Sequence, residues 1–178
     1  MEIKLSGFGG QGIIRMGLIL GRAASIFDDK NATLTQSFGP EARGGATRSD
    51  VIISGSEIMY PKVVQANVLI CLTQEAYTKF SPIIRPGGLL LTDTKFVKTH
   101  KKVDARQREL PMFRSVMEKI GKPIVFNICM LGAIVRLTEV VRSESVMKVL
   151  QQRIPSGFLE MNRQAMDLGM SLGDQFMD

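Results

Sequence analysis

The sequence predicts an α/β protein with a Rossmann-like, mainly parallel sheet, helices on both faces of that sheet and a helical C-terminal third. Three observations support this fold class. A short strand at the N-terminus enters a glycine-rich loop and then a helix. Two continuous apolar runs further along the chain are typical of strands buried on both faces. The last third of the chain contains only helical patterns. Strands that alternate with helices favour a parallel sheet with right-handed crossovers.

The first strand is short, because Ile3 and Leu5 are followed directly by glycines. Apolar and small residues then recur at helical spacing, which predicts a helix: Ile13, Met16, Gly17, Leu20, Ala24 and Phe27. Gly17 and Gly21 lie one turn apart, and we expect them to let this helix lie close to the sheet.

The middle of the chain alternates strand-like runs with turns and one short helix. Further strands are predicted at residues 32–37, 47–54, 67–72 and 88–92. Residues 38–46 are too rich in glycine for regular structure and predict a structured loop. Residues 74–80 suit a short helix that ends before Pro82.

The C-terminal third is predicted to be helical throughout. Helices are expected at residues 113–120 and 128–141, and Ser143 and Ser156 are candidate N-caps for two more. No repeat, linker or low-complexity segment interrupts the chain. We therefore expect one domain spanning residues 1–178.

Composition narrows the class of protein. A chain of 178 residues can bury roughly 70% of its surface and needs no disulfide or metal to fold. Hydrophobic residues make up 44% and charged residues 22%, and no apolar run approaches the ~18 residues of a membrane span. Residues 1–5 lead directly into a strand without the layout of a signal peptide. These features predict a cytoplasmic protein that does not enter a membrane.

The cysteines and the histidine argue against a metal centre. Cys71 and Cys129 both lie in apolar runs, far apart in sequence, and are expected to be buried thiols. Iron–sulfur clusters normally take four thiolates and structural zinc takes four Cys or His ligands, whereas His100 is the only histidine here. We expect no metal and no cofactor to be bound by this chain alone.

Positive charge is spread along the chain, which carries a net charge of +6. One stretch is denser: Lys95, Lys98, Lys101, Lys102, Arg106 and Arg108. A solvated loop is the simplest interpretation, and contact with an acidic partner or a phosphate is the alternative. The sequence has no zinc finger, RNA-recognition motif or aromatic interleaving, so nucleic-acid binding is not expected.

The N-terminal glycine loop matches G-x-G-x-x-G between a strand and a helix. Free N–H groups and the positive end of the helix dipole would face the loop, so an anion could bind there, with Arg15 assisting. Two interpretations remain open. The loop faces a phosphate-bearing ligand or a partner subunit, or its glycines serve only the geometry of the strand-to-helix turn. The candidate binding residues are Gly7, Gly9, Gly10, Gln11 and Gly12.

A dinucleotide site requires an acidic residue at the end of the second strand, which binds the ribose. Residues 34–37 contain no acid, and Asp28 and Asp29 precede the strand and are expected to form the solvated end of the first helix. No Gly-Lys-Ser/Thr follows the loop, which excludes a Walker A motif. NAD or FAD binding is therefore disfavoured.

A second glycine-rich segment, residues 37–45, places an arginine beside paired glycines in a loop after a strand. Arg43, Gly44 and Gly45 could together meet an anion or a partner carboxylate. Alternatively, Glu41 and Arg43 satisfy each other in a tight connection. Loops after parallel strands gather at one edge of the sheet, so both glycine segments should face it. With no nucleophile motif and one histidine, the chain is not expected to catalyse a reaction by itself.

Three motifs, at residues 7–12, 37–45 and 127–133, resemble those of the gamma subunit of 2-oxoacid:ferredoxin (or acceptor) oxidoreductases. The resemblance covers essentially the whole chain and is closest to the 2-oxoglutarate type, with the pyruvate type as the alternative. It implies a single pyruvate/ketoisovalerate oxidoreductase gamma-type catalytic domain.

The resemblance also implies a role in oxidative decarboxylation of a 2-oxoacid to an acyl-CoA, within a complex with alpha and beta, and possibly delta, subunits. Thiamine diphosphate, Mg and iron–sulfur clusters are expected on those partners, coenzyme A as co-substrate and ferredoxin as electron acceptor. The glycine loops would help to shape the coenzyme A entrance. A stand-alone nucleotide- or CoA-binding module, a purely structural assembly subunit and an NAD dehydrogenase are the alternatives.

Overall fold

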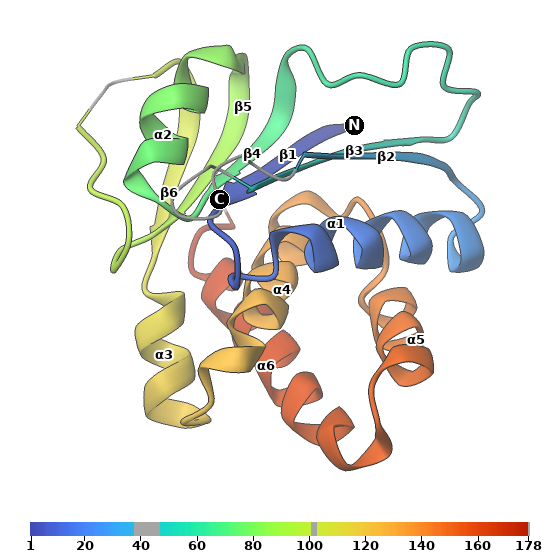
Figure 1. Ribbon diagram of the computed structural model, residues 1–178, viewed down its shortest axis with the longest axis vertical. Helices are drawn as coiled ribbons and strands as arrows, with labels where there is room; N and C mark the ends of the chain where they lie inside the picture. The colour runs from blue at the N-terminus through green and yellow to red at the C-terminus, as the bar shows by residue number, and fades with distance from the viewer. Residues whose placement is uncertain (38–46, 101–102, 178) are drawn as a thin grey trace.

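Six strands form one mixed, mostly parallel sheet in the order β2-β3-β1-β4-β5-β6 (Figure 1). The computed structural model describes residues 1–37, 47–100 and 103–177. The strands are β1 (Glu2–Gly7), β2 (Asn31–Ser37), β3 (Thr47–Ser54), β4 (Ala66–Cys71), β5 (Ile84–Asp93) and β6 (Ala105–Leu110). β3 pairs antiparallel with both β1 and β2, whereas β1, β4, β5 and β6 pair in parallel. The predicted fold class is confirmed.

Helices cover the two faces of the sheet unequally. They are α1 (Ile13–Arg22), the π-helix η1 (Ala23–Phe27), α2 (Gln74–Phe80), the 3-10 turn η2 (Ser81–Ile83), α3 (Met112–Lys119), the 3-10 turn η3 (Pro123–Val125), α4 (Phe126–Thr138), α5 (Ser143–Arg153) and α6 (Ser156–Asp174). Figure 1 shows α2 on one side of the sheet and α1, α4, α5 and α6 on the other. Among the residues that the structure describes, no helix combines the length and apolarity needed to cross a membrane.

The larger of two hydrophobic cores lies between the sheet and α1, α4, α5 and α6. α4 is its centre, since residues 126–135 are all buried. α4 and α6 meet through their backbones: a Cβ on Gly169 would collide with the Cys129 carbonyl oxygen and lie 3.0 Å from the Ala133 nitrogen. The smaller core lies under α2, where Tyr77 and Cys71 are fully buried.

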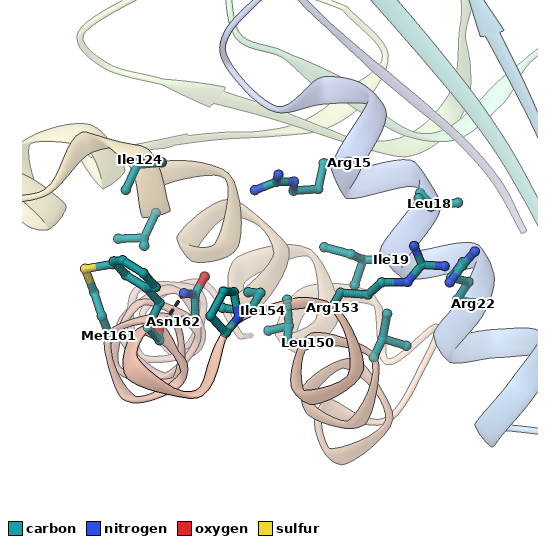
Figure 2. Close-up of a pocket in the computed structure, with 14 residues that line it drawn as sticks. Arg15, Leu18, Ile19, Arg22, Ile124, Leu150, Arg153, Ile154, Met161 and Asn162 are labelled. Carbon is teal, nitrogen blue, oxygen red and sulfur yellow. Dashed lines mark hydrogen bonds between the residues drawn. The ribbon is translucent and has the colours of Figure 1, made fainter.

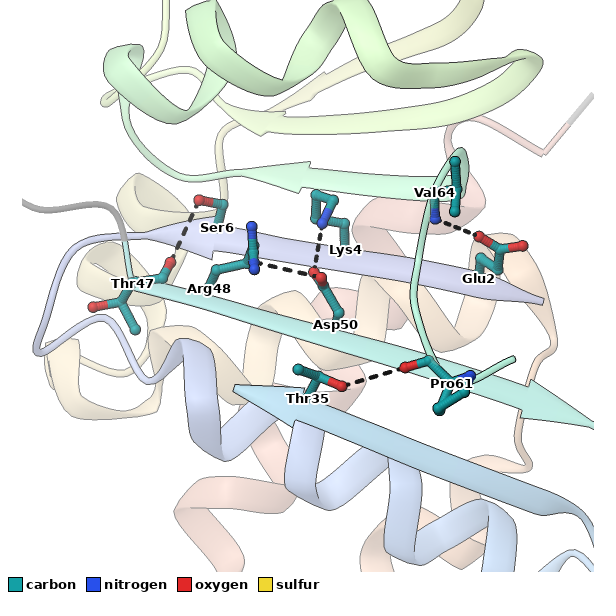
Figure 3. A network of polar contacts seen from close by, with 9 residues as sticks. All are labelled: Glu2, Lys4, Ser6, Thr35, Thr47, Arg48, Asp50, Pro61 and Val64. Carbon is teal, nitrogen blue, oxygen red and sulfur yellow. Dashed lines mark hydrogen bonds and ion pairs between the residues drawn. The ribbon is translucent and has the colours of Figure 1, made fainter. Parts of the chain in front are cut away.

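A buried ion pair joins β1 to β3 (Figure 3). Lys4 faces Asp50 in the antiparallel register, and its Nζ donates to Asp50 Oδ1 at 2.7 Å. Arg48 approaches the other carboxylate oxygen at 3.4 Å. Burial lowers the pKa of Lys4, although the hydrogen bond to Asp50 opposes this shift. This pairing exists only because β3 runs opposite to its neighbours.

Most predicted elements are confirmed, and the ranges 47–54 and 74–80 have the bounds expected from the sequence. One strand was missed. Arg106 and Arg108, predicted to lie in a solvated loop, belong to β6 at the edge of the sheet. An edge strand can carry polar side chains because only part of its surface is covered, so β6 lacks the apolar run that identifies β4 and β5.

Three local predictions are wrong. Ser143 and Ser156 are the first helical residues of α5 and α6 rather than side-chain N-caps. Gly21 makes no close approach, whereas a Cβ on Gly17 would collide with the Ser49 side chain. The Asp28 side chain is 3% exposed rather than solvated, because Arg142 binds it.

Candidate functional site

The glycine loop connects β1 to α1 at the carboxyl end of β1. Gly12 is the N-cap of α1 and has a left-handed backbone with φ of +75°. A Cβ at this position would lie 2.8 Å from Asn127 Cβ, at the start of α4. Gly12 is therefore required both for its backbone conformation and for the contact between the two helix starts.

Gln11 holds the loop in shape from inside. Its Oε1 accepts a hydrogen bond from the Phe8 N–H at 3.0 Å, and its Nε2 donates to the Leu72 carbonyl, also at 3.0 Å. Leu72 follows β4, so this side chain ties the loop to the neighbouring strand. A Cβ on Gly7 would collide with Gln11 Oε1, which explains why Gly7 precedes the loop. Gln11 and Gly7 thus help to fix the shape of the loop.

Two helices begin at this loop without side-chain caps. α1 begins at Ile13 after Gly12, and α4 begins at Phe126 after Val125; neither N-cap residue supplies a side-chain hydrogen bond. The first N–H groups of a helix have no intrahelical acceptor and carry the positive end of the dipole. The Gly12–Asn127 contact brings both helix starts to one place. The Phe126 N–H already donates to the Pro123 carbonyl in η3, so the N–H groups at the start of α1 are the donors that favour an anion there.

A cavity of about 870 Å³ opens in front of the loop. It is lined by Phe8, Gly9, Gly10, Gln11, Gly12, Ile13, Ile14, Arg15, Leu18, Thr47, Lys95, Phe96, Phe113, Pro123, Ile124, Phe126 and Asn127. Two of these lining residues, Arg15 and Lys95, are positively charged. Among the residues that the structure describes, no Asp or Glu lines the cavity. The cavity is therefore electropositive.

A buried carboxylate positions Lys95 on the cavity wall. Asp93, at the end of β5, is fully buried and accepts hydrogen bonds from the backbone N–H of Lys95 at 2.9 Å and of Phe113 at 2.7 Å. Burial raises the pKa of Asp93, while these N–H groups and the nearby Lys95 charge oppose the shift. Lys95 Nζ lies 3.5 Å from the centre of the Phe113 ring, a cation–π contact that orients the ammonium group.

Three aromatic rings form the apolar part of the wall. The ring centres of Phe96 and Phe113 are 5.2 Å apart, and each lies 5.7 Å from that of Phe126. These distances are typical of edge-to-face packing. The cavity thus combines N–H donors and cations with a rigid aromatic surface, and it suits a ligand that carries both an anionic and an apolar group.

Asn127 is a candidate ligand-binding residue that is not among the binding residues predicted from the sequence. It is 5% exposed, lines the cavity, and its Oδ1 has no hydrogen-bond partner among the described residues. A buried amide oxygen without a partner is costly, and a donor group on a bound ligand would satisfy it. The signal was present in the sequence, since Asn127 opens the third motif. Lys95 belongs to the dense basic stretch, for which phosphate contact was the alternative interpretation, whereas the aromatic residues gave no such signal.

The second glycine segment can be placed only through its neighbours. Arg43, Gly44 and Gly45 lie outside the described residues. Ser37 pairs with Arg48, and Thr47 pairs with Gly7, so both flanks of the segment lie at the edge that carries the glycine loop. Thr47 also lines the cavity.

The thiols do not suit a metal or an iron–sulfur cluster. Cys71 and Cys129 are both buried, as predicted, and the structure places them in different cores. Burial raises the pKa of each thiol to about 12, so both remain protonated at neutral pH. Within the described part of the chain, no group of three or more His, Cys, Asp or Glu residues could hold a metal ion.

Comparison with known proteins identifies the family. Residues 2–172 match the model of the pyruvate ferredoxin/flavodoxin oxidoreductase family. The chain belongs to this family. Its family members include the 2-oxoglutarate synthase subunit KorC of Methanocaldococcus jannaschii, 48% identical over 98% of this chain and 94% of that protein. KorC of Methanothermobacter marburgensis is 38% identical over 96% of this chain and 95% of its own length.

Solved structures of the oxidoreductase family have the same fold. The gamma subunit of a keto/oxoacid ferredoxin oxidoreductase from Geobacter sulfurreducens is 41% identical, with a TM-score of 0.87 over 98% of both chains. A 2-oxoglutarate:ferredoxin oxidoreductase from Magnetococcus marinus, with 2-oxoglutarate, coenzyme A and succinyl-CoA bound, has a TM-score of 0.90. It is 22% identical, covers 98% of this chain and 31% of the other, and shows the fold alone.

Proposed function

We propose that this chain is the gamma subunit of a 2-oxoglutarate:ferredoxin oxidoreductase and that the cavity at its glycine loop binds the phosphate-bearing part of coenzyme A. The 48% identity to a 2-oxoglutarate synthase subunit along nearly the whole chain supports the complex and its substrate. The relatives are named as subunits, so the chain contributes to an assembled enzyme. Oxidative decarboxylation of the 2-oxoacid would take place on its partners.

One structural observation carries the ligand assignment: the start of α1, which has no side-chain cap, and the cations Arg15 and Lys95 line one cavity, and no acid is among its described lining residues. Phosphate oxygens would accept hydrogen bonds from the backbone N–H groups at Gly12 and Ile13, and Arg15 and Lys95 would neutralise their charge. The aromatic wall would hold the apolar part. Bound coenzyme A supplies the thiol that accepts the acyl group.

Within this proposal the predicted residues have separate roles. Gly9, Gly10, Gln11 and Gly12 line the cavity, and Gln11 together with Gly7, which is not among the lining residues, also holds the loop in shape. Arg43, Gly44 and Gly45 are proposed as additional ligand contacts, because the segment that carries them begins and ends at the same sheet edge.

The remaining cofactors are assigned to partner subunits. Thiamine diphosphate with Mg and the iron–sulfur clusters would be held by alpha, beta or delta components, and ferredoxin would accept the electrons. The protonated, buried thiols of this chain support that division. We propose that residues 1–178 act as one gamma-type domain in this assembly.

The test uses the complex reconstituted from co-expressed subunits. We expect Lys95→Ala to raise the KM for coenzyme A about tenfold while the KM for 2-oxoglutarate stays unchanged, since a charge-assisted hydrogen bond contributes about 1.5–3 kcal/mol. Lys98→Ala is the matched control, because Lys98 is also exposed but is not among the residues that line the cavity. An unchanged KM for coenzyme A, with less complex recovered, would instead identify a purely structural assembly subunit.

A further inference from the structure

A second cavity, of about 450 Å³, lies between α1, α5 and α6 (Figure 2). Its walls are largely apolar and include Leu18, Ile19, Val125, Val149, Leu150, Ile154, Phe158 and Met161. Several of these side chains belong to the larger core, so the floor of the cavity is fixed by the packing of the helices. The proposed coenzyme A site does not use this cavity, although Arg15, Leu18 and Ile124 border both.

Three arginines surround the cavity. Arg15 and Arg22 come from α1 and Arg153 from α5. Figure 2 shows the Arg153 side chain extending from α5 toward α1, where Arg22 is located. Within the described ranges, no acid lines the cavity and none of the three forms an ion pair. Like charges on facing helices repel, so an anionic group between Arg22 and Arg153 would stabilise this arrangement.

Two apolar side chains that line the cavity are exposed. Ile124 is 72% exposed and Phe158 is 56% exposed. A small anion bound inside would leave both side chains in water. A protein segment would cover them, and exposed apolar groups with polar surroundings are characteristic of protein interfaces.

We propose that this cavity is a docking site for an acidic segment of a partner subunit, which inserts an apolar side chain between α1 and α5 and places carboxylates beside Arg22 and Arg153. Charge complementarity selects an acidic partner, and the apolar walls select the inserted side chain. This proposal rests on the proposed function in one respect: the chain must assemble with partner subunits.

The charge requirement is tested on the reconstituted complex with Arg22→Glu/Arg153→Glu. We expect the dissociation constant of this chain from its partners to rise at least about tenfold, and its dependence on salt concentration to become weaker. The control, Arg114→Glu/Arg163→Glu, changes the net charge equally at exposed arginines that pair with acids of their own helices. Circular dichroism would verify that both variants fold. Equal affinities for the variant and the control would overturn the proposal.

The identity of the occupant is tested by a photo-crosslinking amino acid in place of Phe158 in the same complex. A crosslink to a partner segment that contains acidic and apolar residues is expected. A crosslink to a basic segment, no crosslink, or a small anion that copurifies with the complex and is lost in Arg22→Glu/Arg153→Glu would each overturn the proposal. Turnover of 2-oxoglutarate by the wild-type complex would show that the proposed function stands even then.

Discussion

At the scale of single residues, the glycine loop depends on the contact between Gly12 and Asn127. The two helix starts can approach only because Gly12 has no Cβ and adopts φ of +75°. Gln11 Oε1 accepts a hydrogen bond from the Phe8 N–H within the loop, and Gln11 Nε2 donates to the carbonyl of Leu72, after β4; each bond is 3.0 Å long. The arrangement of the candidate site follows from these few contacts.

Replacement of Gly12 by Ala should therefore be costly. We expect Gly12→Ala to lower the free energy of unfolding by about 1–3 kcal/mol, because it adds backbone strain and a clash with Asn127. Urea denaturation would measure the change. Gly9→Ala is the control, since a Cβ on Gly9 would meet nothing within 4 Å. Similar losses in both variants would contradict the role assigned to Gly12.

At the scale of secondary-structure elements, the end of η1 is joined to the start of α5 by a buried carboxylate. Asp28 accepts hydrogen bonds from the Arg142 backbone N–H and from Arg142 Nε, each at 2.8 Å, and from the Ser145 hydroxyl. Burial by itself would raise the pKa of Asp28, but these hydrogen bonds and the Arg142 charge outweigh it and lower the pKa below its ordinary 3.8.

This joint predicts a pH-dependent stability. The lowered pKa means that the ionised Asp28 stabilises the fold at pH values above 3.8, and that this stabilisation is lost as the pH falls through the lowered value. We expect Asp28→Asn to be less stable than wild type by about 1–3 kcal/mol at pH 7, with the difference shrinking in acid. Urea titrations across pH would show this convergence.

Asp29→Asn provides the matched control for that series. Asp29 is exposed, and Asn tolerates its positive φ of 51°. Its stability should follow wild type at every pH. If Asp28→Asn stayed less stable than wild type by the same amount down to strongly acidic pH, the charge of Asp28 would not contribute to stability.

At the scale of the whole molecule, the sheet separates two cores, each containing one buried cysteine. Cys129 belongs to the larger core and Cys71 to the smaller. Both thiols have a pKa of about 12 and are inaccessible in the folded state. Their reaction with iodoacetamide at pH 8 therefore requires the protein to open.

We expect the two thiols to be labelled at the same rate at each urea concentration if residues 1–178 unfold as one cooperative domain. Mass spectrometry of the two cysteine peptides would measure both rates, and peptides of the fully unfolded chain would give the reference. Faster labelling of Cys71 would show that the smaller core under α2 opens independently, and would contradict a single cooperative unit.

The fold class, the family and most element ranges could be predicted from the sequence, because they depend on local patterns. The continuous apolar runs of β4 and β5 identify strands buried on both faces, and the motif at residues 7–12 identifies the strand–loop–helix connection. β6 was missed because a polar edge strand has no such pattern.

The set of residues that share the cavity could not be predicted, because it depends on tertiary packing. Lys95 follows β5 and Asn127 lies in the first turn of α4, yet both line the cavity at the glycine loop, because the parallel strands end at one edge and Asn127 packs against Gly12. The antiparallel direction of β3 likewise follows from pairing, which places Asp50 opposite Lys4. Contacts between residues distant in sequence depend on the packing of whole elements, and no local pattern encodes them.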